Sequence, residues 1–356
     1  MYYPLESWIT PLTSIRRERL LPVPGEVLVG YGERVGPADV VARCQVRGHM
    51  RVVDVSRALG VDRTRATRYV RKAAGETIQA DELLAGHRGL LGSLRGSVQS
   101  PVEGQIVEVR DGLVVIEAAP TTLELSAHLK GQITNVMPKR GVVISAVGTL
   151  IQGLWGCGGE AEGVLKLLVD SPQSPLRASA IDVSCHGTII VGGHIVDEKA
   201  LEQAVEAQVR GAVAGSVSAK LCPFLESLPF PVLVTGGFGS MSMSEPVFSL
   251  LHASMGREAM ISTYRSGRWG GRRPEVIIPL RVEDELPSED TGPCPLKVGD
   301  QVRILREPQL GGLGTVTGLP RLPHTVESGA RLSVAEVELQ DGDVAMVPLS
   351  NVELIR

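Results

Sequence analysis

Short apolar runs bounded by glycine dominate the pattern of hydrophobic and polar positions between about residues 21 and 170. Two near-copies, Gly32–Ala42 and Gly75–Ala85, each read glycine, acid, any residue, apolar, and later acid, two apolar residues and alanine. Glycine permits the positive φ of a tight turn, and the apolar positions can face one shared core. Each copy therefore predicts two short strands joined by a turn. We expect both copies to pair with the hairpin that opens at Ser100–Val107.

A helical pattern interrupts these strands between Val52 and Lys72. Asp54 stands where a helix N-cap is expected, and Gly60 can end that first helix in the left-handed conformation. Asp62 can cap a second helix that runs towards Lys72. The pattern therefore predicts a helical insert at residues 52–72 within the β-rich region.

The pattern changes again after residue 170. A buried strand, an amphipathic helix and two further apolar strands follow in the order Gly187–Gly193, Glu198–Gln208, Gly211–Gly215 and Pro231–Thr235. A second helix is predicted at Pro246–Met255. Strands that alternate with helices are typical of parallel sheets, so this order predicts a small parallel α/β domain over residues 176–280.

Two glycine pairs follow strands of this predicted domain, Gly192 with Gly193 and Gly236 with Gly237. Open parallel sheets bind ligands at the edge where such loops gather, and glycine turns can offer backbone N–H groups to an anion. The pairs are therefore candidates for an anion or ligand site. Neither has the lysine of a nucleotide-binding phosphate loop or the full glycine spacing of a dinucleotide fingerprint.

The ends of the chain complete the domain plan. Residues 1–20 read as an N-terminal arm, and residues 281–295 as an acidic linker with the charge, proline and serine of a solvated connection. Residues 296–356 predict a separate small β domain. The fold class expected for the whole chain is multidomain, β-rich α+β.

The near-copies and the Ser100–Val107 hairpin resemble the biotinyl/lipoyl-like barrel-sandwich hybrid superfamily over residues 21–170. Carrier members of that superfamily present a modified lysine at a hairpin tip. The nearest approach in this chain is Met137-Pro138-Lys139, where the proline departs from the family pattern. The resemblance therefore implies a structural or docking module rather than a carrier.

The segments Leu296–Ile304, Gly311–Val316 and Val337–Ile355 resemble a KOW-type SH3-like barrel, with a glycine turn at Gly314 as its most characteristic element. KOW modules occur in proteins of transcription and the ribosome, where they bind RNA or protein. Residues 297–356 contain six Lys/Arg and eight Asp/Glu, a balance that disfavours strong phosphate binding. Docking to a protein is therefore at least as well supported as binding to RNA.

Composition narrows the class of protein. The 356 residues are 43% hydrophobic and 21% charged with a net charge of −4, so no overall field attracts a polyanion or an anionic membrane. No apolar run approaches the roughly 20 residues of a membrane span, and the N-terminus lacks the pattern of a signal peptide. We therefore expect a cytoplasmic protein with no membrane partner.

Cysteine spacing argues against a metal site. The five cysteines are far apart and form no Cys-x-x-Cys pair, so neither a zinc site nor a disulfide framework is predicted. Cys157 is the cysteine that we expect to be most exposed. No cofactor, no metal and no catalytic residue are predicted.

Two basic segments are candidates for binding nucleic acid or phosphate. Between Arg51 and Lys72 there are seven basic and two acidic residues, and a helix-turn-helix reading would present Arg63, Arg65 and Arg68. A solvated helical hairpin is the preferred interpretation. The second segment surrounds an aromatic ring with guanidinium groups at Arg265, Arg268, Trp269, Arg272 and Arg273. The preferred interpretation there is a surface loop whose arginines pair with the acidic linker that follows.

Three hypotheses for function remain open, and the sequence favours a protein without catalytic machinery. The leading hypothesis is a non-enzymatic binding or scaffold protein that docks onto a protein partner or larger complex associated with transcription or translation. The second is direct nucleic-acid binding through Arg51–Lys72 and Arg265–Arg273. The third is a ligand-sensing or enzymatic α/β domain that uses the glycine turns.

Overall fold

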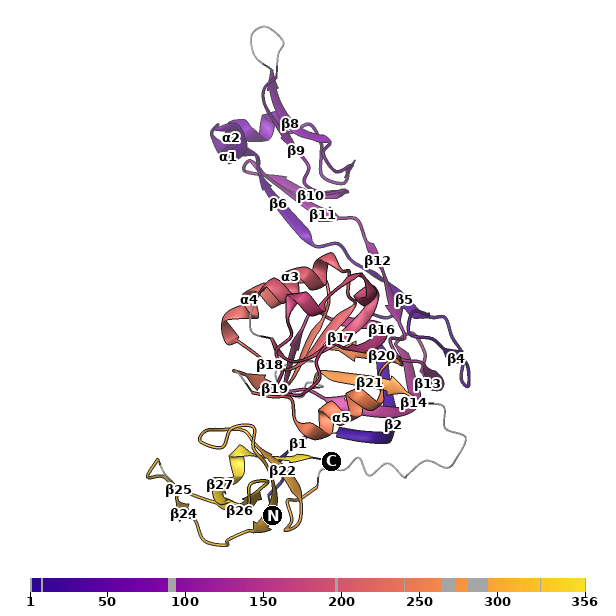
Figure 1. Ribbon diagram of the computed structural model, residues 1–356. Helices are drawn as coiled ribbons and strands as arrows, with labels where there is room; N and C mark the ends of the chain where they lie inside the picture. The colour runs from indigo at the N-terminus through magenta and orange to yellow at the C-terminus, as the bar shows by residue number, and fades with distance from the viewer. Residues whose placement is uncertain are drawn as a thin grey trace.

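The computed structural model describes residues 2–7, 9–88, 94–195, 198–239, 241–263, 273–280, 294–326 and 328–355. The molecule is elongated, and a distal lobe, a central body and a C-terminal unit follow one another along its length (Figure 1). We use "distal lobe" for residues 50–118 and "inner lobe" for residues 25–46 with 121–137. The strand-rich composition expected for the chain is confirmed.

An eleven-stranded sheet runs through the central body into the inner lobe. In spatial order its strands are β15 (Trp155–Cys157), β19 (Val232–Phe238), β18 (Gly211–Val217), β17 (Thr188–Ile195), β16 (Glu160–Leu167), β20 (Glu258–Ser262), β21 (Glu275–Pro279), β14 (Gly141–Gln152), β13 (Gly131–Met137) and β4 (Arg34–Val35). The remaining strand, β2 (Ile9–Leu20), pairs with β14.

The parallel part of this sheet has the predicted order of strand, helix, strand, connection and strand. Strands β16, β17, β18 and β19 are parallel neighbours. Helices α3 (Glu198–Glu206) and α4 (Cys222–Leu225) pack on one face, and α5 (Glu245–Ala253) packs on the other. Alternating strand residues such as Ile189 and Ile190 supply the two separate cores.

The hydrogen bonding of the sheet continues across the predicted domain limits. The limits at residues 170 and 176 lie between β16 and β17, which pair in parallel. Strand β14 pairs along its first half with β13 and along its second half with β21, while β2 runs along the whole of its other edge. One strand therefore belongs to both the inner lobe and the central body.

A two-stranded antiparallel ribbon carries the distal lobe. In the inner lobe, β5 (Val40–Val46) pairs with β12 (Thr121–Ser126) and with β3 (Glu26–Val27). After a short passage the same two chain segments pair again as β6 (Met50–Asp54) and β11 (Leu113–Ala118). The distal lobe is therefore an insertion into the inner lobe, entered and left through adjacent strands.

The distal lobe has its own small core. Beside β6 and β11 lie β10 (Gly104–Arg110) and β7 (Thr77–Ile78), and β8 (Leu83–Arg88) pairs with β9 (Leu94–Gln99). Buried Val55, Ile78, Ile106, Val114 and Ile116 fill the space between them. A folded unit of this size is stabilised mainly by such apolar burial.

The near-copies organise two equivalent structures, one in each lobe. The N–H of Gly32 donates to the carbonyl of Ile133 at 2.8 Å, and the N–H of Gly75 donates to that of Ile106 at 2.7 Å. The side-chain amides of Gln132 and Gln105 reach the carbonyls of Gly32 and Gly75, both at 2.9 Å. Each hairpin is also interrupted by a bulge one residue after its isoleucine.

This equivalence changes the expected pairing. The copy at Gly75 pairs with the strand that follows Ser100, as predicted. The copy at Gly32 does not pair with that strand, because it finds a second Gly-Gln-Ile strand of its own at Gly131–Met137. The two copies therefore lie in different lobes and do not share one core.

The segment predicted as a helical insert contains two short helices with the expected caps, whereas its first residues, 52–54, belong to strand β6 and its second helix ends at Ala66 instead of continuing towards Lys72. The side chain of Asp54 accepts from the N–H of Arg57 at the start of α1 (Val55–Leu59), and Gly60 ends that helix at φ 64°. Asp62 caps α2 (Arg63–Ala66), which continues as the 3-10 turn η1 (Thr67–Tyr69). Buried Val55 and Ala66 fasten this hairpin onto the distal core.

The C-terminal unit is a six-stranded sheet that also includes the N-terminus. Its order is β1 (Leu5–Ser7), β28 (Val352–Ile355), β22 (Gln301–Ile304), β23 (Leu313–Gly318), β26 (Val334–Leu339) and β27 (Val344–Pro348). A small hairpin of β24 (His324–Thr325) and β25 (Arg331–Leu332) and the 3-10 turn η5 (Leu349–Asn351) complete it. The predicted arm at residues 1–20 is therefore two strands, β1 in this unit and β2 in the central sheet. Most of the predicted acidic linker, residues 281–293, lies outside the described residues.

The expected turn at Gly314 is wrong. Gly314 lies inside β23, between Val302 and Leu339 on the neighbouring strands. A Cβ atom there would come within 2.5 Å of the carbonyl oxygen of Glu338, so the glycine allows close strand packing instead of a turn.

A buried ionic cluster joins the C-terminal unit to the central sheet. The side chain of Arg303 on β22 donates to the carboxylate of Glu353 and, at 2.7 Å, to the carbonyl of Thr235 on β19. Glu353 is fully buried and also pairs with Arg273. A buried carboxylate requires such donors because it has left water.

We predict that Arg303→Met destabilises the protein by about 3 kcal/mol, because it removes a donor from the buried Glu353 carboxylate and leaves the Thr235 carbonyl without its partner. Urea denaturation followed by circular dichroism measures this change. The matched control is Arg306→Met at an exposed position of the same unit, which should change stability by less than about 0.5 kcal/mol. Equal stability of the two variants would contradict the prediction.

Candidate functional site: a charged cleft beneath the inner lobe

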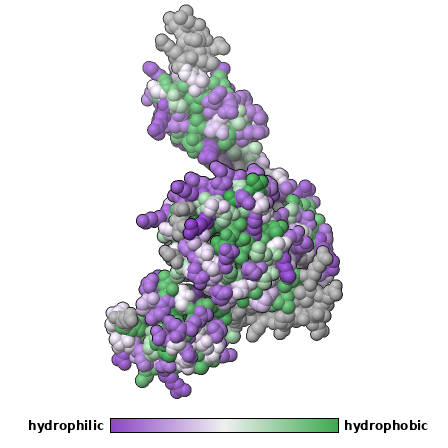
Figure 2. Space-filling view, in the orientation of Figure 1, coloured by the Kyte–Doolittle hydropathy of each residue, from purple (hydrophilic) through white to green (hydrophobic). Residues whose placement is uncertain are grey.

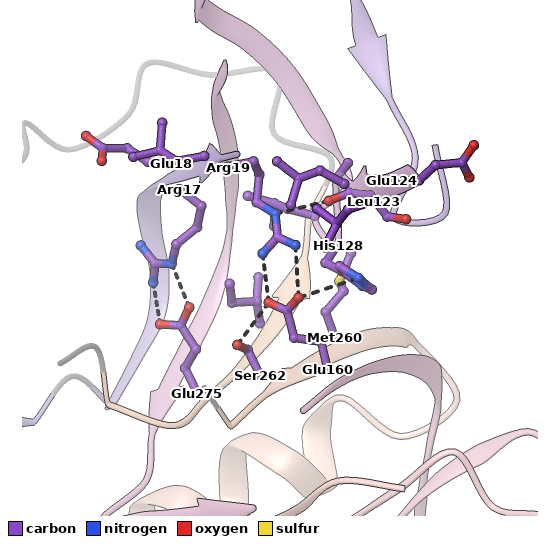
Figure 3. Close-up of a pocket in the computed structure, with 16 residues that line it drawn as sticks. Arg17, Glu18, Arg19, Leu123, Glu124, His128, Glu160, Met260, Ser262 and Glu275 are labelled. Atoms are coloured by element: carbon purple, nitrogen blue, oxygen red, sulfur yellow. Dashed lines mark hydrogen bonds and ion pairs between the residues drawn. The ribbon is translucent and has the colours of Figure 1, made fainter. Parts of the chain in front are cut away.

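A cleft of about 650 Å³ separates the inner lobe from the central sheet. Strands β2, β12, β16, β20 and β21 contribute its walls (Figure 3). Its side chains divide into an apolar group, which includes Leu123, Met260 and Ile277, and a charged group with the two arginines of β2 at its centre. A cavity with this mixture of apolar and charged side chains is the default candidate for a binding site.

The first ion pair of the cleft joins Arg17 to Glu275. The Nε atom of Arg17 lies 2.6 Å from Oε1 of Glu275, and the second bond joins Nη2 to Oε2. Both side chains are largely buried, with 17% and 6% of their surfaces exposed. This pair therefore fixes β2 against β21 at one end of the cleft.

The second ion pair is part of a larger network around Glu160. Arg19 donates to both carboxylate oxygens of Glu160, at 2.9 and 3.0 Å, and its Nε atom donates to the carbonyl of Ser126 at 3.0 Å. Ser262 adds a hydroxyl donor at 3.1 Å, and Nε2 of His128 lies 3.4 Å from the same carboxylate. Figure 3 shows all these side chains converging on one point.

Strand geometry explains why these arginines enter the cleft. Arg17 and Arg19 are two residues apart on β2, so their side chains point to the same side of the strand. Both arginines lie in the segment predicted as an N-terminal arm and are not among the predicted site residues. The spacing of Arg17 and Arg19 along an extended segment is the local signal that could have indicated a shared face. No local signal indicates their partners, because Glu160 and Glu275 come from distant parts of the chain.

His128 has an unusual backbone and a perturbed side chain. Its φ is 48°, in the left-handed region, and its N–H donates to the carbonyl of Pro37. Burial lowers the pKa of the imidazole below its usual 6.5, and the nearby Glu160 carboxylate opposes that effect. The imidazole is therefore neutral at physiological pH, and Glu160 is balanced by Arg19 instead.

The ion pairs engage the arginines of the cleft and the Glu160 carboxylate with one another. Both guanidinium groups are held by carboxylates in two-bonded geometry, and both oxygens of Glu160 have donors. An anionic substrate would have to displace a carboxylate from an arginine. The cleft therefore acts as a charged joint that holds the inner lobe on the central sheet.

The predicted basic helices are brought together but are very short. Arg63 and Arg65 lie on α2, which has four residues, and Arg68 lies on the turn that follows. All three are exposed. A single helical turn that packs on the distal core is too short to lie along a major groove, so the structure has the helical hairpin rather than a helix-turn-helix.

The second basic segment falls mostly outside the described residues, which exclude Arg265, Arg268, Trp269 and Arg272. The structure places Arg273, the remaining member, against the buried Glu353 of the C-terminal unit. That guanidinium group therefore belongs to the ionic cluster between the central sheet and the C-terminal unit.

The predicted glycine turns are wrong as turns. Gly192 and Gly193 lie within β17, and Gly236 and Gly237 lie within β19. A Cβ atom at Gly193 would come within 2.3 Å of the carbonyl oxygen of Ser174, so this glycine lets the segment at Ser174–Pro175 run closely beside β17. The expected loop of free N–H groups is therefore not formed at these positions.

Cys157 on β15 is half-buried, as are Cys222 and Cys294, whereas Cys44 and Cys185 are buried. Burial raises the pKa of the Cys157 thiol to about 11, and the nearby Glu226 and Cys222 contribute in the same direction. The thiolate is the nucleophile in cysteine chemistry, so this cysteine is a poor one at neutral pH.

Within the described ranges there is no group of three or more His, Cys, Asp or Glu side chains placed to hold a metal ion. In the same part of the chain, no helix combines the length and the apolar character that crossing a bilayer demands.

We predict that the free energy of unfolding falls as the pH drops below about 6.5, the usual pKa of histidine, and goes on falling until the pH has passed the lower pKa that His128 has in the folded protein. The unfolded chain takes up a proton there more readily than the folded chain does, so the contribution of the neutral imidazole is complete above the unfolded pKa and is lost below it. Melting temperatures measured between pH 5 and 8 test this. His128→Asn tolerates the left-handed backbone and should show a weaker pH dependence.

The matched control for that measurement is His324→Asn, because His324 is exposed on the C-terminal unit. Its pH profile should follow the wild type. The same profile for His128→Asn and the wild type would refute the role of His128.

We also predict that Cys157 is alkylated about 100-fold more slowly at pH 8 than an ordinary thiol with a pKa of 9.0. Its rate should increase about tenfold for each pH unit towards pH 11, because the thiolate fraction does so. Peptide-level mass spectrometry after iodoacetamide treatment measures the rate for this cysteine alone. Unfolding in urea should restore ordinary reactivity, and rapid labelling of the folded protein at pH 8 would contradict the prediction.

Neither the protein-family models nor the curated proteins compared with this chain give a match. The case for its function therefore rests on its own residues and their arrangement.

Proposed function

We propose that this protein is a non-enzymatic binding or scaffold protein that docks onto a larger assembly through its distal lobe. The observation that carries this proposal is the projection of the lobe on a two-stranded ribbon, away from the charged cleft (Figure 1). Figure 2 shows the lobe standing clear of the central body. An inserted unit that contributes nothing to the central core is well placed to contact a partner.

The outer face of the distal lobe supports a contact role. Met50 and Val52 are 54% and 62% exposed on β6, which is an edge strand of its sheet. They are two residues apart and share one face, with Val115 opposite Val52 on the next strand. Grouped apolar side chains in contact with water are typical of interaction surfaces.

The fixed attachment of the C-terminal unit also favours a scaffold. The buried contact of Arg303 with Glu353 and Thr235 holds this unit on the central sheet. A partner on the distal lobe would therefore be kept at a defined distance from one on the C-terminal unit. The resemblance of that unit to a KOW-type barrel favours an assembly of transcription or translation.

The second candidate function is nucleic-acid binding through Arg51–Lys72 and Arg265–Arg273. Five exposed arginines of the helical insert favour it, namely Arg57, Arg63, Arg65, Arg68 and Arg71. Among the described residues, none of these guanidinium groups lies within ion-pair distance of a carboxylate. Phosphate groups are natural partners for such side chains.

We predict that Met50→Thr/Val52→Thr reduces recovery of the docking partner about tenfold in cross-linked affinity purification of the full chain, because two apolar contacts are lost. Threonine keeps the strand propensity of β6. The matched control is Val344→Thr/Met346→Thr, which changes two exposed apolar residues on the edge strand β27 of the C-terminal unit.

If the partner is recovered with Met50→Thr/Val52→Thr but lost with Val344→Thr/Met346→Thr, the docking site lies on the C-terminal unit and not on the distal lobe. Recovery that disappears after nuclease treatment, in high salt and in Arg57→Gln/Arg63→Gln/Arg65→Gln would favour the nucleic-acid function instead. Purification of the bait alone under gentle and cross-linked conditions would refute docking.

A further inference from the structure

Strand β12 is an exposed edge strand at the mouth of the charged cleft. It stands at one end of the three-stranded sheet that it forms with β5 and β3, and its first four residues are exposed. Proteins commonly protect such edges with lysine or proline, because the unpaired backbone groups of an edge are a template for another strand. The sequence of β12, Thr-Thr-Leu-Glu-Leu-Ser, contains neither.

The register of the sheet shows which backbone groups β12 offers. Leu28 donates to the carbonyl of Val41, so positions 41 and 43 of β5 bond with β3, and positions 42 and 44 bond with the two leucines of β12. Thr122 and Glu124 therefore direct their N–H and C=O groups away from β5. Within the described part of the chain no other strand pairs with this edge.

One end of this edge already bonds with a group from outside its sheet. The carbonyl of Ser126 accepts from Nε of Arg19 at 3.0 Å. Ser126 is two residues from Glu124, so its carbonyl lies on the same edge. A strand added to β12 would therefore lie along Thr121–Leu125 and end beside Arg19.

The cleft supplies an apolar face beside the free edge. Leu123 and Leu125 point to one side of β12 and line the cleft. Leu20 of β2 lines it as well, and the side chains of Leu123 and Leu20 remain 38% and 41% exposed. Apolar side chains of an added strand would remove these leucines from water.

A row of alternating charges crosses the other side of the same sheet. Glu26 of β3, Arg43 of β5 and Glu124 of β12 lie directly opposite one another. Arg43 is held by Glu26 at 2.8 Å, and Glu124 forms no ion pair among the described residues. Figure 3 shows the Glu124 carboxylate pointing away from the cleft. A basic residue on an added strand would continue the alternation of charge.

We propose that the free edge of β12 binds an extended segment of a partner protein as an added antiparallel strand, with a basic side chain opposite Glu124 and apolar side chains on either side of it in the cleft. Main-chain hydrogen bonds to Thr122 and Glu124 supply affinity, and the alternation of apolar and basic side chains supplies specificity. A second copy of β12 lacks this pattern, because the strand has no basic residue to place opposite Glu124. The site is independent of docking through the distal lobe, because β12 belongs to the inner lobe.

The first test is titration of the full-length protein with the fluorescein-labelled peptide acetyl-Val-Lys-Leu-Thr-Val, followed by fluorescence anisotropy. In the antiparallel register its lysine lies opposite Glu124 and its leucine opposite Leu123. We expect saturable binding with a Kd on the order of 100 μM. The same peptide with glutamate in place of lysine should bind at least fivefold more weakly. Equal binding of the two peptides, or no saturable binding of the first, would overturn the proposal.

N-methylated peptides test the main-chain hydrogen bonds without any change to the protein. In the antiparallel register the N–H of the peptide lysine points to β12, whereas the N–H of the peptide leucine points away. N-methylation of the lysine should therefore weaken binding at least tenfold, and N-methylation of the leucine should change it by less than threefold. Equal effects at the two positions would refute strand addition.

Two variants of the protein locate the site. Thr122→Pro removes an N–H of the free edge and should weaken binding at least tenfold, and proline is accepted there because that N–H does not bond with β5. Glu124→Gln should weaken binding about threefold, as is usual for an exposed ion pair. The matched control is Glu108→Gln, at an exposed position of β10 in the distal lobe, which should bind like the wild type. Unchanged binding in Glu124→Gln and in folded Thr122→Pro would refute the site.

The other possible occupant of the edge is a second copy of the chain. Sedimentation velocity of the full-length protein should give the same mass for the wild type and Thr122→Pro. A wild-type dimer that is lost in Thr122→Pro would overturn the proposal, because β12 would then pair with its own copy. Peptide binding should be unchanged in Met50→Thr/Val52→Thr, so strand addition and docking through the distal lobe are tested separately.

Discussion

The structure depends above all on the sharing of strand β14 between two lobes. Its 12 residues pair with β13 of the inner lobe, with β21 of the central body and, along the other edge, with β2. Backbone hydrogen bonds of a buried strand cannot be given up cheaply, because each N–H and C=O group would lose its partner. The inner lobe, the central body and the N-terminal strand are therefore parts of one sheet, and the orientation of the ribbon that carries the distal lobe follows from it.

Ion pairs hold together segments of this structure that backbone pairing alone does not join. Arg17 and Arg19 bring β2 against glutamates of β21 and β16, and Arg19 also reaches the carbonyl of Ser126 in β12. A similar cluster fastens the C-terminal unit, in which Arg303 reaches the carbonyl of Thr235 on β19 and Glu353 pairs with Arg273. Each cluster joins segments that are far apart in sequence. Breaking a buried ion pair leaves an uncompensated charge, so these clusters penalise any arrangement that separates the joined segments.

The two near-copies give the molecule its extended shape. Equivalent hydrogen bonds at Gly32 and Gly75, and equivalent glutamine contacts from Gln132 and Gln105, show that one structural unit is inserted into another of the same kind. The inner lobe faces the central sheet and supplies His128 to the charged cleft, whereas the distal lobe is covered by the helical hairpin. The same local pattern thus serves as a wall in one place and as a projecting surface in the other.

The sequence by itself determined the local elements: the strand and helix order of the α/β segment, the caps at Asp54, Gly60 and Asp62, and the repeated glycine-acid units. These elements depend on residues only a few positions apart, so short stretches of the sequence are enough to predict them. Tertiary structure decided which strand each copy pairs with, that Gly193 and Gly314 lie inside strands, and that Arg19, His128 and Glu160 meet. Their separation along the chain leaves no local pattern, since only pairing through β14 and the packing of β16 brings them within contact distance.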